Sequence, residues 1–114
     1  MMLTSLPSFP KLQDHFQTIK DKTLRELFDE DPQRASKLSQ EFETIFLDYS
    51  KNRITRDTLQ LLLRLVEEAG LKQKIEDMFT GKKINTSENR AVLHTALRNV
   101  SGQAVDFEGA NVME

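Results

Sequence analysis

The segment from Thr55 to Gly70 constrains the fold most, because both of its ends can be recognised in the sequence. Thr55 can cap a helix through its side-chain oxygen, and Ile54 and Leu59 on either side of that cap can form a hydrophobic staple. Glycine readily adopts the left-handed conformation that ends many helices, so Gly70 is the expected stop. The segment therefore predicts a helix with an apolar face made of Leu59, Leu62, Leu63 and Val66.

Three short helices are predicted before residue 40. Pro10 suits the first position of a helix, because its missing N–H would be unpaired there anyway. Thr23 and Glu26 have the spacing of a capping box for the second helix, and Asp31 followed by Pro32 predicts the start of the third. The expected inward positions are Leu12, Phe16 and Ile19, then Leu24, Leu27 and Phe28, then Ala35 and Leu38. A further helix is predicted over residues 71–79, ended by Gly81.

One strand is predicted from Glu41 to Tyr49, because this run is rich in aromatic and β-branched residues. Its apolar residues fall on both faces, so both faces are expected to be covered. The weak run Gln103 to Phe107, before the Glu108–Gly109 turn, is the only candidate partner strand. The predicted fold class is therefore mainly α with one or two short β-strands, in a single unit of residues 1–114.

Length and composition fit one ordinary domain and exclude several classes of function. The 114 residues carry 16 Lys and Arg against 18 Asp and Glu, a formal charge of −2, which favours neither nucleic acid nor a membrane as partner. No cysteine is present, which excludes disulfides and thiolate chemistry. The first residues have no basic region followed by a long apolar core, so we expect a cytoplasmic protein.

The run from Ile84 to Asn99 predicts one more helix, with Asn85 as its cap. Arg90, His94 and Arg98 lie four residues apart and would share one face of it. Guanidinium groups beside a histidine can hold a phosphate, so these three residues form a candidate anion-binding stripe. The structural alternative is favoured, because Arg98 near a helix end complements the helix dipole and Arg90 can pair with carboxylates.

No complete catalytic or metal site is predicted. His15 and His94 are the only histidines, and neither belongs to a pattern such as H-E-x-x-H, so structural roles are expected for both. The carboxylate pairs Glu67–Glu68 and Glu76–Asp77 diverge on their helices and are expected to face solvent. We therefore assign no catalytic residue, no cofactor-binding residue and no metal ligand.

Three elements of the chain together resemble the glucose-6-phosphate isomerase (phosphoglucose isomerase) family. The first runs from Gly81 to Asn99 (GKKINTSENRAVLHTALRN), and the second from Leu47 to Thr55 (LDYSKNRIT). The third is the closing Asn111 to Glu114, where the family more usually has Asp-Gly-Lys-Asp-Val-Met-Pro-Glu. The elements come in family order, and the resemblance covers nearly the whole chain.

The resemblance implies that this chain is the N-terminal helical segment of a larger α/β isomerase. Family enzymes interconvert glucose 6-phosphate and fructose 6-phosphate without a metal or organic cofactor, in homodimers. A histidine helps to open the sugar ring, and a glutamate moves a proton through a cis-enediol. The residues that carry this chemistry, and those that bind the sugar phosphate, belong to regions after Glu114.

The segment alone is therefore expected to be inactive and to pack on the remaining domains of its own chain. The alternative is an independent helical interaction module without enzymatic activity. Some family members also signal in a secreted form, and no residue pattern here favours that role.

Overall fold

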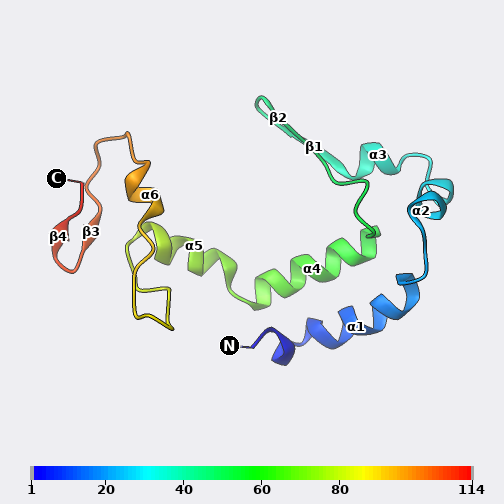
Figure 1. Ribbon diagram of the computed structural model, residues 1–114, viewed down its shortest axis with the longest axis horizontal. Helices are drawn as coiled ribbons and strands as arrows, with labels where there is room; N and C mark the ends of the chain where they lie inside the picture. The colour runs from blue at the N-terminus through cyan, green and yellow to red at the C-terminus, as the bar shows by residue number, and fades with distance from the viewer. Residues whose placement is uncertain (1, 114) are drawn as a thin grey trace. The chain divides into compact units, whose positions relative to one another are not determined.

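The computed structural model describes residues 2–113, which form six α-helices, one 3-10 helix and two β-hairpins (Figure 1). This composition confirms the predicted fold class, mainly α with short strands. None of the helices in the described residues combines the length and hydropathy needed to cross a bilayer. In chain order the elements are η1 (Leu3–Ser5), α1 (Ser8–Ile19), α2 (Leu24–Glu30), α3 (Arg34–Lys37), β1 (Ser39–Phe42), β2 (Ile45–Asp48), α4 (Arg56–Glu68), α5 (Leu71–Phe79), α6 (His94–Leu97), β3 (Asp106–Phe107) and β4 (Ala110–Asn111).

The chain divides into two compact units, Met1–Ala69 and Gly70–Glu114. The sequence predicts one continuous unit instead. Gly70 lies at the boundary with a left-handed φ of +68°, and it separates α4 from α5. That residues 1–114 together form one segment of a larger protein is a separate prediction, and it stays a prediction.

In the first unit, α1 packs against α4. The two helices run antiparallel. Ser8 at the start of α1 contacts Glu68 at the end of α4, and His15 further along α1 contacts Thr58 near the start of α4. Helix α1 begins at Ser8 rather than at Pro10, so the proline is the third helical residue. It is still tolerated there, because the N–H groups of the first helical turn have no partner within the helix.

The predicted boundaries of α4 are confirmed. The Thr55 side chain accepts a hydrogen bond from the backbone N–H of Thr58, and the Thr58 hydroxyl accepts one from the N–H of Thr55. Most of the predicted apolar face stays exposed in this chain. Leu62, Leu63 and Val66 are 39%, 55% and 39% exposed.

The face of α4 that packs on α1 is turned toward Thr58, which is buried. Leu61 and Leu65, three and seven residues further on, are half-buried on the same face. The polar pair between Thr58 and His15 sets this orientation. Apolar periodicity alone therefore points to a face that stays exposed in this chain.

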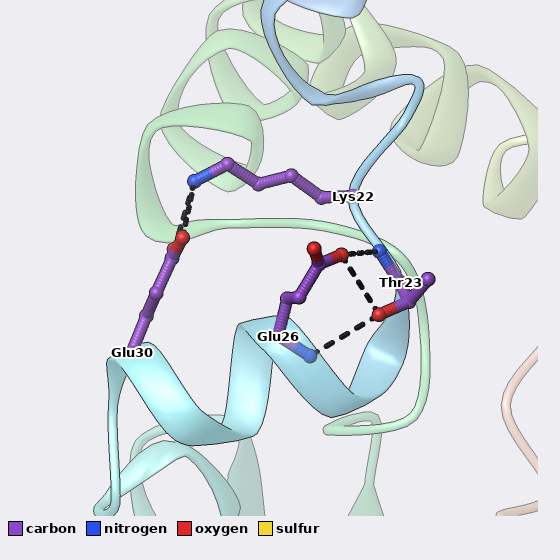
Figure 2. A network of polar contacts seen from close by, with 4 residues as sticks. All are labelled: Lys22, Thr23, Glu26 and Glu30. Carbon is purple, nitrogen blue, oxygen red and sulfur yellow. Dashed lines mark hydrogen bonds and ion pairs between the residues drawn. The ribbon is translucent and has the colours of Figure 1, made fainter.

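Helix α2 begins with the predicted capping box, shown in Figure 2. The Thr23 Oγ1 accepts from the backbone N–H of Glu26 at 3.2 Å, and Glu26 Oε2 accepts from the N–H of Thr23 at 2.7 Å. These hydrogen bonds from the backbone and side chain of Thr23 keep the pKa of Glu26 below its usual value. Lys22, on the loop just before the cap, forms an ion pair of 2.8 Å with Glu30, the last residue of α2.

Helix α3 begins later than predicted, at Arg34. The Asp31 carboxylate accepts from the backbone N–H of Gln33 at 3.1 Å, which closes a turn before the helix instead of capping it. Leu38 is buried as expected. Ala35 is exposed, however, and Arg34 takes the buried position.

The prediction of a single strand from Glu41 to Tyr49 is wrong. This segment belongs to a hairpin in which β1 pairs antiparallel with β2, with Phe42 opposite Ile45 and Gln40 opposite Leu47. Glu43 begins the two-residue turn with a left-handed φ of +52°. The sequence hides this turn because neither of its residues is glycine or asparagine, which such turns favour.

The expected cover over this segment is also absent from the described chain. Phe42, Ile45, Phe46 and Leu47 are 72%, 66%, 67% and 56% exposed. Its expected strand partner instead forms a second, shorter hairpin, in which Phe107 of β3 pairs with Ala110 of β4. In the described residues, each hairpin has only its own two strands.

In the second unit, the prediction of a long helix over residues 84–99 is wrong. Asn85 and Arg90 exchange two backbone hydrogen bonds of 3.0 and 3.1 Å, and only His94–Leu97 is helical. The Asn85 side chain accepts from Ser87 Oγ at 2.9 Å, which favours a tight turn over a helix start. Asn89, with a φ of +53°, interrupts any helix before it can reach His94.

Helix α5 has the predicted boundaries. Gly81 follows it with a φ of +75° and is buried. A Cβ atom at this position would lie 2.8 Å from the backbone oxygen of Asp106, so the end of α5 closely approaches β3. Among the described residues of the whole chain, the buried apolar side chains are few: Leu6, Leu27, Leu38 and Ala96.

Candidate functional site

The structure does not bring Arg90, His94 and Arg98 onto one helix face. Arg90 lies in the bridge with Asn85, and its guanidinium is 3.9 Å from the Glu88 carboxylate. His94 begins the short helix α6, and Arg98 lies directly after its end. The Arg98 Nη1 donates to the backbone oxygen of His94 at 3.2 Å. The helical stripe that motivated an anion site is therefore not formed as predicted.

His94 and Arg98 do share an open groove of about 580 Å³ in the second unit. Both side chains are exposed, and Arg98 already satisfies a carbonyl at the end of its own helix. The rest of the groove wall consists of apolar and uncharged polar side chains. The groove therefore lacks a set of hydrogen-bond donors that converge on one point, as phosphate binding requires. The other lining residues are Met78, Phe79, Thr95, Asn99, Val100, Ser101 and Gln103. Anion binding by Arg90, His94 and Arg98 stays a prediction.

The most specific polar contact of the first unit joins Ser8 and Glu68. One Glu68 oxygen accepts from the backbone N–H of Ser8 at 2.9 Å, and the other accepts from its hydroxyl at 2.7 Å. Ser8 is only 1% exposed. A carboxylate at this place satisfies an N–H that the first turn of α1 leaves unpaired, and it lies at the positive end of the helix dipole.

This contact was missed from sequence, which placed Glu68 toward solvent. The hydrogen bonds from the hydroxyl and then from the N–H of Ser8 keep the pKa of Glu68 below its usual value. A signal existed in the serine two residues before Pro10, because serine is common where helices start. Its partner 60 residues away could not be identified from local pattern.

The second polar contact between α1 and α4 joins His15 and Thr58, whose Nε2 and Oγ1 atoms are 2.6 Å apart. Thr58 is buried and also accepts from the backbone N–H of Thr55. His15 therefore fixes the start of α4 against α1. The expected structural role of His15 agrees with this geometry.

Arg34 was also missed. Its side chain is 4% exposed, its Nε donates to the Ser50 backbone oxygen at 2.8 Å, and its Nη2 donates to that of Asn52 at 2.6 Å. The guanidinium also lies 5.5 Å from the centre of the Phe28 ring. These contacts tie α3 to the loop that leads into α4. The two hydrogen bonds hold structure.

The remaining perturbed carboxylates are paired locally. Hydrogen bonds from Lys82 and then Gln73 lower the pKa of Asp77, and the same Asp77 pair raises that of Lys82. Within residues 2–113, no three side chains of the metal-binding types gather closely enough to hold an ion. The polar residues of this chain thus act on neighbouring elements.

Comparison with known proteins supplies the family. The sequence model of the family described as Phosphoglucose isomerase matches residues 48–114, which is more than half of the chain. The chain belongs to the phosphoglucose isomerase family.

Relatives in this family match the chain along nearly its whole length. It is 47% identical to glucose-6-phosphate isomerase of Methylococcus capsulatus over 110 residues, which is 96% of this chain and 20% of that protein. It is 47% identical to that of Helicobacter pylori (strain HPAG1) over 113 residues, 99% of this chain and 21% of that protein. The corresponding values for Roseiflexus castenholzii are 46% over 112 residues, 98% and 21%. The chain spans about a fifth of the length of these phosphoglucose isomerase relatives.

Proposed function

We propose that this chain is a structural segment of a glucose-6-phosphate isomerase, which interconverts glucose 6-phosphate and fructose 6-phosphate, and that the chain alone is inactive. The observation that carries the proposal is the identity of 46–47% along nearly all of this chain, which matches only about a fifth of each relative. In this proposal, the acid–base groups that open the sugar ring and move the proton belong to the other four-fifths of the protein. No cofactor is assigned to the segment.

Exposed apolar side chains support a role inside a larger protein. On α4, Leu62, Leu63 and Val66 are 39–55% exposed, and on α5 Leu71, Ile75 and Phe79 are 43–58% exposed. Leaving such helix faces partly in water forgoes part of the about 1.5–3 kcal/mol that full burial of a large apolar side chain contributes. An independent interaction module, the alternative function, would need a second protein to cover all of them.

The proposal extends to partners and location. The segment packs on the remaining domains of its own chain, in a homodimer whose other regions bind the sugar phosphate. It contacts neither nucleic acid nor membrane, in keeping with a net charge of −2, and works in the cytoplasm. The groove beside His94 and Arg98 is a secondary candidate for anion binding in the same protein.

The direct test is a chimera in which this chain replaces the matching fifth of the Helicobacter pylori isomerase. We expect the chimera to convert fructose 6-phosphate to glucose 6-phosphate in a coupled assay, because the chain supplies the scaffold that the matched segment supplies. The isolated chain is expected to show no turnover. The Helicobacter pylori enzyme without its matching segment serves as the second control.

Two results would contradict the proposal. Turnover by the isolated chain, lost on changing His94→Ala or Arg98→Ala, would place a catalytic site inside this segment. A folded but inactive chimera would show that this chain cannot act as the scaffold. A continuous reading frame beyond the codon for Glu114 is the expected genetic counterpart.

A further inference from the structure

The hairpin formed by β1 and β2 carries its apolar side chains mainly on one face. Residues opposite each other in an antiparallel pair lie on the same face, and successive residues alternate between faces. Phe42, Ile45 and Leu47 therefore share one face, with Gln40 opposite Leu47. The other face carries Phe46 opposite Glu41. We call the first of these the hairpin face.

The hairpin face is the most apolar exposed surface on a strand in the described residues. Its three apolar side chains are 72%, 66% and 56% exposed, although β-branched and aromatic residues favour strands that are at least half buried. A hairpin of two strands is at best marginally stable in water without further packing. The hairpin therefore has the composition of an element that is covered in its working environment.

Charge argues against a second copy of the same hairpin as the cover. Residues 39–48 contain Glu41, Glu43 and Asp48 and no basic side chain. Two such hairpins packed by their hairpin faces would bring two strongly acidic elements together with no basic side chain to offset them, although Glu41 and Asp48 lie on the opposite face. A different surface is therefore the better candidate for the cover.

We propose that the hairpin face docks on the part of the full-length isomerase that lies outside the segment matched by this chain. That part exists in the relatives, because this chain accounts for only 20–21% of their length. The inference rests on the proposed function and adds to it a named contact surface, made of Phe42, Ile45 and Leu47.

Hydroxyl-radical footprinting of the chimera described above tests this inference. We expect oxidation of Phe42 and Leu47 to fall severalfold in the chimera relative to the isolated chain, because docking removes both side chains from water. A free peptide added at the same concentration to each sample serves as the reference for labelling.

Substitution in both backgrounds gives the second measurement. Ile45→Asp is expected to lower the unfolding temperature of the chimera, but to change that of the isolated chain little, since Ile45 is 66% exposed there. Thr44→Asp adds the same charge one residue away, in the turn, and is the matched control. Equal effects of Ile45→Asp in both backgrounds would overturn the docking.

Activity and footprint separate the two proposals. An active chimera with Phe42 as reactive as in the isolated chain overturns the docking and leaves the proposed function intact. An inactive chimera with Phe42 protected contradicts the proposed function and supports the docking. Protection of Phe42 in the isolated chain that grows with its concentration would assign the hairpin face to a second copy and overturn the inference.

Discussion

At the scale of single residues, polar side chains fix both ends of the α1–α4 interface. Glu68 holds the first turn of α1 through Ser8, and His15 holds the start of α4 through Thr58. Both contacts join side chains more than 40 residues apart, and the serine and the threonine are buried. Hydrogen bonds of this kind contribute direction as well as energy, since they select one rotation of α4 about its axis.

Glu68→Gln is expected to lower the urea midpoint of unfolding, because the amide has one acceptor oxygen for the two hydrogen bonds that Ser8 donates, and its NH2 group cannot accept the other. Glu68 has a folded pKa below its usual value of 4.5. Its carboxylate therefore stabilises the fold above the unfolded pKa, and this contribution is lost as the pH falls through the folded pKa.

The difference between Glu68→Gln and the unchanged chain should therefore be full at neutral pH and shrink in acid. Chemical unfolding over a series of pH values measures it. Glu67→Gln, one residue away and exposed, is the control and should show no such pH dependence. A constant difference at all pH values would contradict the role given to the carboxylate.

Arg34→Met is expected to destabilise the first unit by about 1–3 kcal/mol, since it leaves the buried Ser50 carbonyl without a donor. The Asn52 carbonyl still accepts from the N–H of Ile54. Methionine keeps an apolar stem like that of arginine, so the loss of stability measures the contribution of the guanidinium group. Urea unfolding gives the free energy, and Arg64→Met on an exposed position of α4 is the matched control. Equal stability of the two variants would show that water replaces the guanidinium at no cost.

At the scale of elements, the close approach of Gly81 to β3 gives a sharp prediction. Alanine at Gly81 would need a left-handed φ and would place its Cβ 2.8 Å from the Asp106 oxygen. Gly109 has a similar φ of +82°, but open space surrounds its Cβ position. We expect Gly109→Ala to cost about 1–2 kcal/mol from backbone strain alone, and Gly81→Ala to cost clearly more.

Urea unfolding of both variants, with amide exchange of residues 71–81 as a local probe, measures the difference. Faster exchange in α5 is expected only for Gly81→Ala. If both variants lost the same stability, the backbone at Asp106 would be able to move away and make room for a Cβ atom at Gly81.

Elements with local signals could be predicted from the sequence, and those set by distant partners could not. Thr23, Thr55 and Gly70 mark helix ends through their own side chains or backbone freedom, and the structure confirms them. The Asn85 side chain also accepts a hydrogen bond from a backbone N–H three residues on, as a helix cap does, but here the bond closes a turn. The turn forms because Asn89 adopts a left-handed conformation, which the sequence does not require. The turn at Glu43 carries no glycine or asparagine, so the hairpin read as one strand.

The candidate site was predictable only in part. His94 and Arg98 lie together, but Arg90 is separated from them once the long helix is lost. The contacts of Glu68 and Arg34 depend on partners 60 and 16–18 residues away. Periodicity reports which side of a helix is apolar, and it cannot report which polar atom a neighbouring element will offer.

At the scale of the whole molecule, the exposed apolar surface predicts how the isolated chain behaves. We expect it to bind a hydrophobic dye, since apolar side chains stand open on the hairpin, α4 and α5. If the other regions cover these faces as proposed, the chimera with the rest of the isomerase should bind much less dye per molecule. Fluorescence titration at equal concentrations makes the comparison.

A cooperative, monomeric unfolding transition of the isolated chain, without dye binding, would favour the independent module over the segment. The Helicobacter pylori enzyme is the control for dye binding by a complete member of the family. The two readings thus differ in solution behaviour before any activity is measured.

The contact between Ser8 and Glu68 also sets an order of events during synthesis. The ribosome must add 60 residues after Ser8 before the partner carboxylate exists. At about 5–20 residues per second, roughly 3–12 seconds pass in which the first turn of α1 has no carboxylate to hold it. Codon changes that slow translation between α1 and α4 would lengthen that interval, during which a nascent α1 is open to chaperones.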